Sequence, residues 1–260
     1  MKKPERVGPY HLLTPLGDSG RSNVWLASAG VGGEKVALKL AREGDIAGRE
    51  RLMHECSMAM AFDHPNIVRM HECGEANGVT WISMGYVAGA HGVLTLANVR
   101  QLLLAMVHVH ANGVIHADIR SGNCLVDESG HLRLAGFALA RRLDDPANMA
   151  HGAPQPDASG ATARQPSDIR ADIFAAGMVL YQVLTGKAPS AGAASEDRRE
   201  RDIGSDSELA PSIVAPGLGD SFDELVHRAT ASDKAQRYAS AFEFLSHFDA
   251  ACRRGVRASS

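Results

Sequence analysis

The sequence lacks any long apolar run. Apolar stretches such as Leu102–Val107 span six residues, whereas a helix needs about 20 apolar residues to cross a bilayer. No apolar run follows the charged start Met1–Arg6, as it would in a secretory signal peptide. The sequence therefore predicts neither a signal peptide nor a membrane span.

Cysteine is scarce as well, with four widely spaced residues and no CxxC pair. This usage is typical of a reducing compartment, so we expect a cytoplasmic protein without disulfides. Two of the four sit in His-x-Cys pairs, His54/Cys56 and His71/Cys73. A metal site remains an alternative for these pairs, although zinc motifs usually have closer, repeated ligands.

Charge of one sign is not in excess. The chain has 27 Lys and Arg against 30 Asp and Glu, a formal net charge of −3, and its basic residues are scattered. Nucleic-acid-binding domains usually carry a clustered basic patch, so nucleic acid is not an expected partner. With 260 residues, of which 45% are hydrophobic, the chain is long enough for one large domain or two small ones.

The patterning changes along the chain from strand-like to helical. Short apolar runs of strand character dominate up to residue 84, and helical spacing dominates from Leu96 onward. This order predicts an α+β fold with two lobes. The expected boundaries are a single domain over 1–260, with a small β-rich N-terminal lobe over 10–84, a connection at 85–87, a larger α-helical C-terminal lobe over 88–250 and a tail at 251–260.

Individual elements follow from the same patterning. We expect a loop at 142–167 and a hairpin turn at Glu75–Gly78. Helices are predicted from Ile46 to Phe62 and, buried on nearly all sides, from Ile173 to Leu184. The predicted strands are Tyr10–Leu16, Val24–Ala27, Val36–Leu40, Ile67–Val68, Val79–Ile82, Cys124–Val126 and Leu132–Leu134.

Four motifs occur in a specific order. A glycine-bearing turn, Gly17–Val24, precedes the strand Val36–Lys39; Glu55 follows on a helix, and then comes His116–Asn123. In this order and spacing the chain resembles the protein kinases, specifically the bacterial serine/threonine type. The resemblance runs from about Tyr10 to Phe248. Further matching segments are Asp63–Val68, Asp168–Ile173, Leu180–Gly186 and Gln236–Ala241.

The resemblance implies a protein that binds ATP with Mg²⁺ and acts on or with another protein. Lys39 would contact the phosphates and pair with Glu55, Asp118 would be the catalytic carboxylate beside Arg120, and Asn123 would be a metal ligand. Val24, Ala37 and Leu125 would enclose the adenine, although plain core packing also suits them. The remaining nucleotide residues implied are Leu16, Gly17, Gly20, Met84, Gly85 and Val87.

The sequence departs from the kinase pattern where the family binds its metal. Thirteen residues after Asn123 the family places the aspartate of Asp-Phe-Gly, and here Gly136 occupies that place with Phe137 after it. Without this carboxylate one metal loses its main anionic ligand, so we expect Mg²⁺ binding to be weakened or absent. The phosphate loop is also altered, because Ser19 and Ser22 occupy two of its three glycine positions.

The activation segment departs from the pattern too. Ala117 replaces the arginine that precedes the catalytic aspartate, and no Ser, Thr or Tyr lies between Ala138 and Ala158. A switch operated by a loop phosphate is therefore not expected. Ala158–Gly160 stands where the family has Ala-Pro-Glu, whose glutamate normally pairs with the arginine present here as Arg237.

Three interpretations follow. The preferred one is a degenerate kinase that retains an ATP pocket, is inactive or weakly active, and functions by binding nucleotide and a protein partner. The second is an active serine/threonine kinase, because Lys39, Glu55, Asp118 and Asn123 are all present. The third is a small-molecule phosphotransferase of the same fold, suggested by the small residue Ala117; the kinase-like segments around Asp172 and Arg237 disfavour it.

Overall fold

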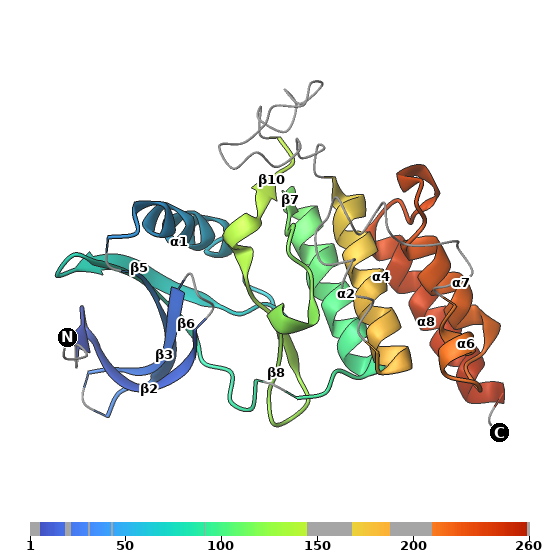
Figure 1. The fold of residues 1–260 in the computed structure, drawn as a ribbon, viewed down its shortest axis with the longest axis horizontal. Coiled ribbons are helices and arrows are strands. Elements are labelled where there is room, and N and C mark those ends of the chain that lie inside the picture. The colour runs from blue at the N-terminus through green and yellow to red at the C-terminus, as the bar shows by residue number, and fades with distance from the viewer. Residues whose placement is uncertain are drawn as a thin grey trace. The chain divides into compact units, whose positions relative to one another are not determined.

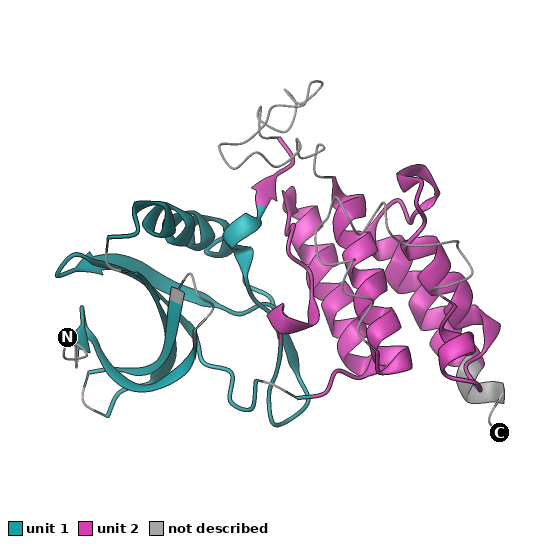
Figure 2. Ribbon diagram, in the orientation of Figure 1, with its two compact units in different colours: residues 1–92, 125–140 teal, residues 93–124, 141–260 magenta. Residues whose placement is uncertain are grey.

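The structure is a computed structural model, and it consists of two compact units, each described here by itself. Unit 1 comprises residues 1–92 and 125–140, and unit 2 comprises 93–124 and 141–260 (Figure 2). The segment 125–140, which the sequence analysis counted with the second lobe, is thus part of unit 1. The structure describes residues 6–18, 22–30, 32–42, 44–90, 92–144, 168–187 and 210–258. Gly20, most of the loop expected at 142–167 and Ala158–Gly160 lie outside these ranges.

Unit 1 is built on a six-stranded antiparallel sheet in the order β1-β2-β3-β4-β6-β5, with α1 packed beside β4, β5 and β6 (Figure 1). Its last strand ends at Gly85. The two-residue strand β1 adds an edge that the sequence analysis did not predict. The elements are β1 (Arg6–Val7), β2 (Tyr10–Asp18), β3 (Ser22–Ala29), β4 (Lys35–Ala41), α1 (Ile46–Ala59), β5 (Met70–Ala76) and β6 (Val79–Gly85).

The predicted hairpin turn is present between β5 and β6. Its two central residues, Asn77 and Gly78, both have positive φ, at 52° and 75°. Two consecutive left-handed residues match the twist of antiparallel strands, and Asn-Gly is the favoured pair for such a turn. The turn therefore sets the register of β5 against β6.

The two faces of this sheet have different roles. One face carries the core cluster, in which Val36, Leu38 and Leu40 of β4 pack with Val7, Tyr10, Ala27 and Trp81. Because side chains alternate along a strand, the residues between them, Ala37 and Lys39, project from the opposite face. Both residues are among those that the sequence analysis assigned to the nucleotide.

Two predictions in unit 1 are wrong in detail. Helix α1 begins after Asp45, whose side chain accepts the Gly48 amide at 2.8 Å, but it ends at Ala59 rather than Phe62. The Phe62 amide bonds to the Ala59 carbonyl, and this shorter i→i+3 bond closes the helix. Ile67–Val68 is not a strand of the sheet, because its backbone bonds to Leu134 instead.

Unit 1 is completed by β8 (Cys124–Val126), β9 (Leu132–Leu134) and the short helix η2 (Phe137–Leu139). β8 and β9 pair with each other as predicted. The Val68 amide donates to the Leu134 carbonyl at 2.9 Å, and the Leu134 amide donates to the Asn66 carbonyl at 2.8 Å. These bonds hold β9 against residues 66–68, which precede β5 of the sheet.

Unit 2 is helical. α2, α4, α7 and α8 pack side by side (Figure 1). Gly177 of α4 permits a close approach to α7, since a Cβ there would lie 2.7 Å from the Ala229 Cβ. The elements are α2 (Leu96–Ala111), β7 (Val114–Ile115), η1 (Ser121–Asn123), β10 (Arg141–Arg142), α4 (Ile169–Thr185), α6 (Pro211–Val214), α7 (Asp220–Ala229), η5 (Lys234–Gln236) and α8 (Ala241–Ala258).

The helix ends of unit 2 follow ordinary capping chemistry. Thr95 and Asn98 form a reciprocal capping box at the start of α2, which satisfies amides that the first turn leaves without partners. Asp168 caps α4, and Gly186 ends it in the left-handed conformation with φ 67°. Within the described ranges, none of the helices is both long enough and apolar enough to cross a membrane. The predicted α+β, two-lobe fold is confirmed.

Candidate functional site

An ion pair links β4 to α1. Lys39 Nζ lies 2.6 Å from Glu55 Oε2, and the two side chains are 19% and 4% exposed. The pair expected from the sequence is therefore present. The Glu55 side chain is almost fully enclosed with the lysine as its ion-pair partner, whereas part of the Lys39 side chain is exposed and open to a further anionic partner.

Strand register brings the expected nucleotide residues of the sheet to one face. Val24 on β3 is paired with Lys39, and Ala37 is paired with Met84 on β6. Directly paired residues of antiparallel strands share a face, so Val24, Ala37, Lys39 and Met84 share one. Ala37, the smallest of the four, precedes Lys39 by two positions on β4.

The other expected nucleotide residues have different settings. Leu16 and Gly17 are exposed near the end of β2, Leu125 is half-buried on β8, and Val87 is buried just after β6. The Gly85 amide donates to the Arg69 carbonyl at 2.9 Å. The Gly85 amide is therefore already bonded within the chain. Gly20 lies outside the described ranges.

In unit 2, the expected catalytic residues form one cluster. Asn123 donates through Nδ2 to the Asp118 carbonyl at 2.7 Å and to Asp118 Oδ2 at 2.8 Å. Arg120 Nε lies 3.4 Å from the same carboxylate. We call Asp118, Arg120 and Asn123 the catalytic-loop set. Since the amide nitrogen of Asn123 is its bonded end, a metal would have to use its Oδ1.

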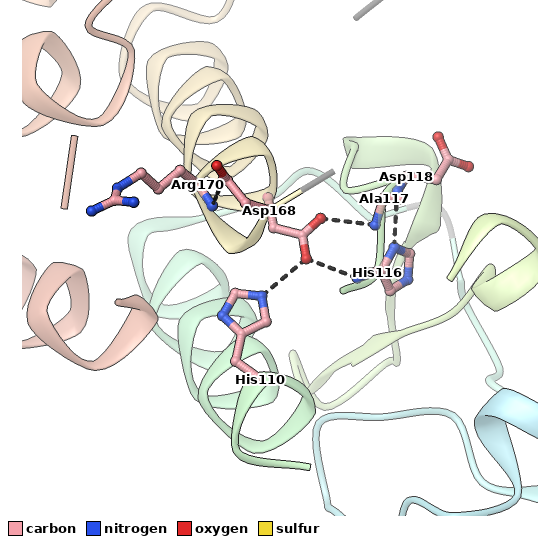
Figure 3. Close-up of polar contacts among 7 residues, drawn as sticks. His110, His116, Ala117, Asp118, Asp168 and Arg170 are labelled. Carbon is pink, nitrogen blue, oxygen red and sulfur yellow. Dashed lines mark hydrogen bonds and ion pairs between the residues drawn. The ribbon is translucent and has the colours of Figure 1, made fainter. Parts of the chain in front are cut away.

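A buried carboxylate that the sequence analysis gave no role holds this loop. Asp172 of α4 accepts the backbone amides of His116 and Ala117, both at 2.8 Å, and His110 Nε2 lies 2.9 Å from its Oδ2 (Figure 3). The pKa of the Asp172 carboxyl is lowered overall, because the contacts with His110 and His116 outweigh the burial that alone would raise it. His116 in turn accepts the Asp118 amide through Nδ1 at 3.2 Å.

The loop contains a residue in an unfavourable conformation. Ala117 has φ +61°, in the left-handed region that residues other than glycine rarely adopt. Such a residue persists only where its surroundings fix it, and here the Asp172 carboxylate holds the Ala117 amide. Asp172 therefore positions Asp118 indirectly, through the backbone of the loop.

Gly136 occupies the expected position in unit 1. It precedes η2 with φ 87° and ψ 48°, and the ring of Phe137 after it packs 5.2 Å, centre to centre, from the ring of Phe62. Phe137 is almost fully buried, which fixes the register of the segment. No carboxylate therefore stands at the position where the family pattern has its aspartate.

The beginning of the activation segment is held by helix α1. His54 Nε2 lies 2.7 Å from the Ala140 carbonyl oxygen, and both residues belong to unit 1. In unit 2, the buried Arg237 donates to the carbonyls of Ala231 at 2.7 Å and Arg170 at 3.2 Å, with its guanidinium 4.7 Å from the Phe174 ring centre. Backbone carbonyl groups thus help to hold Arg237. In the family pattern this arginine pairs with a glutamate.

The His-x-Cys pairs show no metal-site chemistry. Among the described residues, no group of three or more His, Cys, Asp or Glu side chains is arranged to hold a metal ion. Burial, followed by a contact with Cys73, raises the pKa of Cys56 to about 12.

Comparison with known proteins agrees with these motifs. The family model described as protein kinase domain matches residues 10–248. The chain is 32% identical over 265 residues to the serine/threonine-protein kinase PknJ of Mycobacterium tuberculosis, covering 90% of this chain and 44% of that protein. It is 29% identical over 257 residues to PrkC of Bacillus subtilis, covering 90% and 39%. The chain thus spans about two fifths of the length of these relatives.

The fold agrees as well. The crystal structure of the Mycobacterium tuberculosis PknI kinase domain superposes with a TM-score of 0.70 at 25% identity, covering 96% of this chain and 100% of that domain. Proteins of this family in general use ATP and Mg²⁺. The chain belongs to the protein kinase family, with a serine/threonine kinase fold and bacterial serine/threonine kinases among its relatives.

Proposed function

We propose that this protein is a degenerate serine/threonine kinase that binds ATP but transfers its γ-phosphate slowly or not at all. The observation that carries the proposal is Gly136, which stands in the register fixed by the buried Phe137 and has no side chain to hold a metal. Phosphoryl transfer relies mainly on positioning and charge neutralisation. Loss of an anionic metal ligand removes a large part of the charge neutralisation.

Retention of ATP is supported by the sheet of unit 1. The Lys39–Glu55 ion pair holds a cation at the sheet face, with Val24, Ala37 and Met84 on the same face. A lysine fixed in this way offers a point charge to a phosphate. The apolar residues beside it suit an adenine ring.

The residues fit the family's Mg²⁺ site poorly. Mg²⁺ prefers anionic oxygen ligands in near-octahedral geometry. Asn123 offers a neutral amide oxygen, and its nitrogen is already bonded to Asp118. With Gly136 in place of a carboxylate, metal would be held mainly by the phosphates of ATP and by water. Nucleotide affinity then survives, and the loss falls on turnover.

The biological role under this proposal is binding. A kinase fold that changes with nucleotide occupancy can serve as a scaffold, an allosteric partner or a nucleotide sensor for another protein. Because the chain spans about two fifths of its curated relatives, the activity, substrates and partners of a longer protein would be further proposals.

An active kinase is the second candidate, and one observation favours it. Lys39–Glu55 and Asn123–Asp118 are both assembled with short contacts, at 2.6 Å and 2.8 Å. A site released from all catalytic demand has no need for an ordered carboxylate at position 118. Under this alternative, magnesium would be held in an arrangement that does without the aspartate.

Thermal-shift and phosphoryl-transfer assays separate the two candidates. We expect ATP with EDTA to raise the melting temperature by about 5 °C at saturation, and added Mg²⁺ to change this little. Radiolabelled ATP should give little transfer to the protein itself or to a generic substrate. Strictly Mg²⁺-dependent binding together with transfer at about 1 s⁻¹ or faster, an ordinary rate for working kinases, would establish the active alternative.

A further inference from the structure

A cavity in unit 2 has no part in the proposed function. It holds about 420 Å³ and lies among α7, η5 and α8. This volume falls within the range of about 300–1,000 Å³ that is usual for small-molecule sites. Its lining residues all belong to unit 2 and are all described, so the cavity can be considered by itself.

Two helical faces form its walls. On α7 the lining includes Ser221, Glu224, Leu225 and Arg228, and on α8 it includes His247, Ala250, Ala251 and Arg254. Both sets follow the spacing i, i+3, i+4, i+7, which places each on one face of its helix. The small side chains of Ala250 and Ala251 leave space in the middle of the cavity, between the polar residues at the ends of the two helical faces.

Tyr238 lies at the floor of the cavity, and both faces of its ring are covered. Tyr238, which lines the cavity, is stacked on Phe244 with ring centres 4.7 Å apart and 6° between the planes. The Arg228 guanidinium lies 4.3 Å from the Tyr238 ring centre and is ion-paired with Glu243. Glu243 also accepts the Ala239 amide at 2.7 Å. These contacts hold the guanidinium in one place before any ligand arrives.

The polar groups around this floor are mainly donors. Arg228 and Arg254 lie at the ends of the two faces, and His227 and His247 add ring nitrogens. Glu224 is the one carboxylate among the lining residues. The ion pair with Glu243 uses only some of the five N–H donors of Arg228. Burial raises the pKa of Tyr238 to about 12, so its hydroxyl remains a donor. Guanidinium forks of this kind match carboxylate and phosphate oxygens.

We propose that this cavity binds a small organic anion, in which a phosphate or carboxylate group contacts Arg254 and an attached apolar body lies along Leu225, Ala250 and Ala251. The apolar residues of the lining favour a ligand with an organic body over a bare inorganic anion. The site is separate from the nucleotide residues of unit 1, and it stands whether or not the protein transfers phosphate.

The test is an NMR titration of ¹⁵N-labelled protein with phenyl phosphate, inorganic phosphate and benzoate. Phenyl phosphate should shift the amide signals of α7 and α8 and bind more tightly than inorganic phosphate. Benzoate shows whether a carboxylate can replace the phosphate. Arg254→Glu should weaken phenyl phosphate by about tenfold, the usual effect of losing a charge-assisted contact.

The matched control is Arg253→Glu, which makes the same charge change at the neighbouring exposed position of α8 that does not line the cavity. It should alter the affinity by less than about twofold, as expected for a screened surface charge. Ala250→Phe, which fills the cavity without changing charge, should abolish the α7 and α8 shifts. Equal losses in the two arginine variants, unchanged binding in Ala250→Phe, or no shifts in α7 and α8 would overturn the proposal.

Discussion

The catalytic loop and the Gly136 segment differ in what they keep of the family pattern. The loop keeps Asp118 and Asn123, although Ala117 replaces an arginine. It is held by Asp172, His110 and His116 through hydrogen bonds of 2.8 to 3.2 Å. The Gly136 segment keeps its place and its buried phenylalanine, but has lost the functional carboxylate. Metal chemistry can therefore be lost at one residue while the surrounding fold remains.

The two regions also differ in backbone strain. Ala117 holds φ +61° without being glycine, whereas Gly136 holds φ 87° at no cost because it has no Cβ. A non-glycine residue in the left-handed region is less favourable by about 1 kcal/mol or more. The catalytic loop thus contains strain that Asp172 must offset, and the Gly136 segment is relaxed.

The largest effect should come from removing the support of the loop. Asp172→Ala leaves two backbone amides and His110 without their acceptor in a buried site, which should cost about 3–5 kcal/mol of unfolding free energy. Thermal unfolding should therefore shift down by about 10 °C. The control Asp168→Ala, which removes the cap of α4, should cost only about 1 kcal/mol. Equal shifts in both variants would contradict the role given to Asp172.

A smaller loss is expected at the ion pair of unit 1. Lys39→Met leaves the enclosed Glu55 carboxylate without its cation. Because the lysine side chain is 19% exposed, we expect a cost of about 2–3 kcal/mol, below the range of about 3–5 kcal/mol for a fully buried pair. The ATP-induced thermal shift should disappear. Lys35→Met, on the same strand but exposed, should leave that shift intact. If Lys39→Met binds ATP normally, the nucleotide assignment is wrong.

Low pH should destabilise the catalytic loop, because Asp172 then becomes protonated. Its pKa in the folded protein is below the ordinary value, so its contribution is fully present above the unfolded value of about 4 and is lost as the pH falls through the folded value. Asp127 and Glu243, whose pKa values are lowered mainly by backbone hydrogen bonds, act in the same direction. Urea unfolding between pH 7 and 3 should show a shallower decline for Asp172→Asn than for the wild type. Parallel curves would contradict this.

The smallest expected effect tests the strain itself. Ala117→Gly relieves the left-handed strain but gains flexibility when unfolded, so we expect a net stabilisation of no more than about 1 kcal/mol. The same substitution in a regular helix, Ala111→Gly at the end of α2, should instead destabilise by up to about 1 kcal/mol. Denaturant unfolding measures the sign of the change in unfolding free energy for each variant. A decrease for Ala117→Gly would show that the loop is not strained at Ala117.

Much of this fold follows from local sequence pattern. Alternation predicted the strand that carries Ala37 and Lys39, and helical spacing predicted the helix that carries Glu55. The ion pair between Lys39 and Glu55 followed from the resemblance to the protein kinases. Local sequence also predicted the hairpin turn that contains Asn77 and Gly78. The family motif placed Phe137, and its burial agrees with that register.

The features that escaped prediction depend on contacts distant in sequence. The Asp172 contacts to the loop join residues 55 and 56 positions apart, and no local pattern reveals such a bond, although the kinase-like segment Asp168–Ile173 marked the region. Ile67–Val68 has the composition of a strand, yet its backbone pairs with Leu134. The two-residue strand β1 is too short for any alternation to show.

The most direct test of the central claim is the Mg²⁺ dependence of ATP affinity in the wild type and in Gly136→Asp, measured by calorimetry. Aspartate tolerates the left-handed backbone at position 136 better than most residues. Gly136→Asn, equally tolerant and uncharged, is the matched control. We expect added Mg²⁺ to change wild-type and Gly136→Asn affinity by less than about twofold, and to tighten Gly136→Asp by about tenfold, as a new anionic ligand implies. Wild-type affinity that already rises tenfold or more with Mg²⁺ would contradict the account.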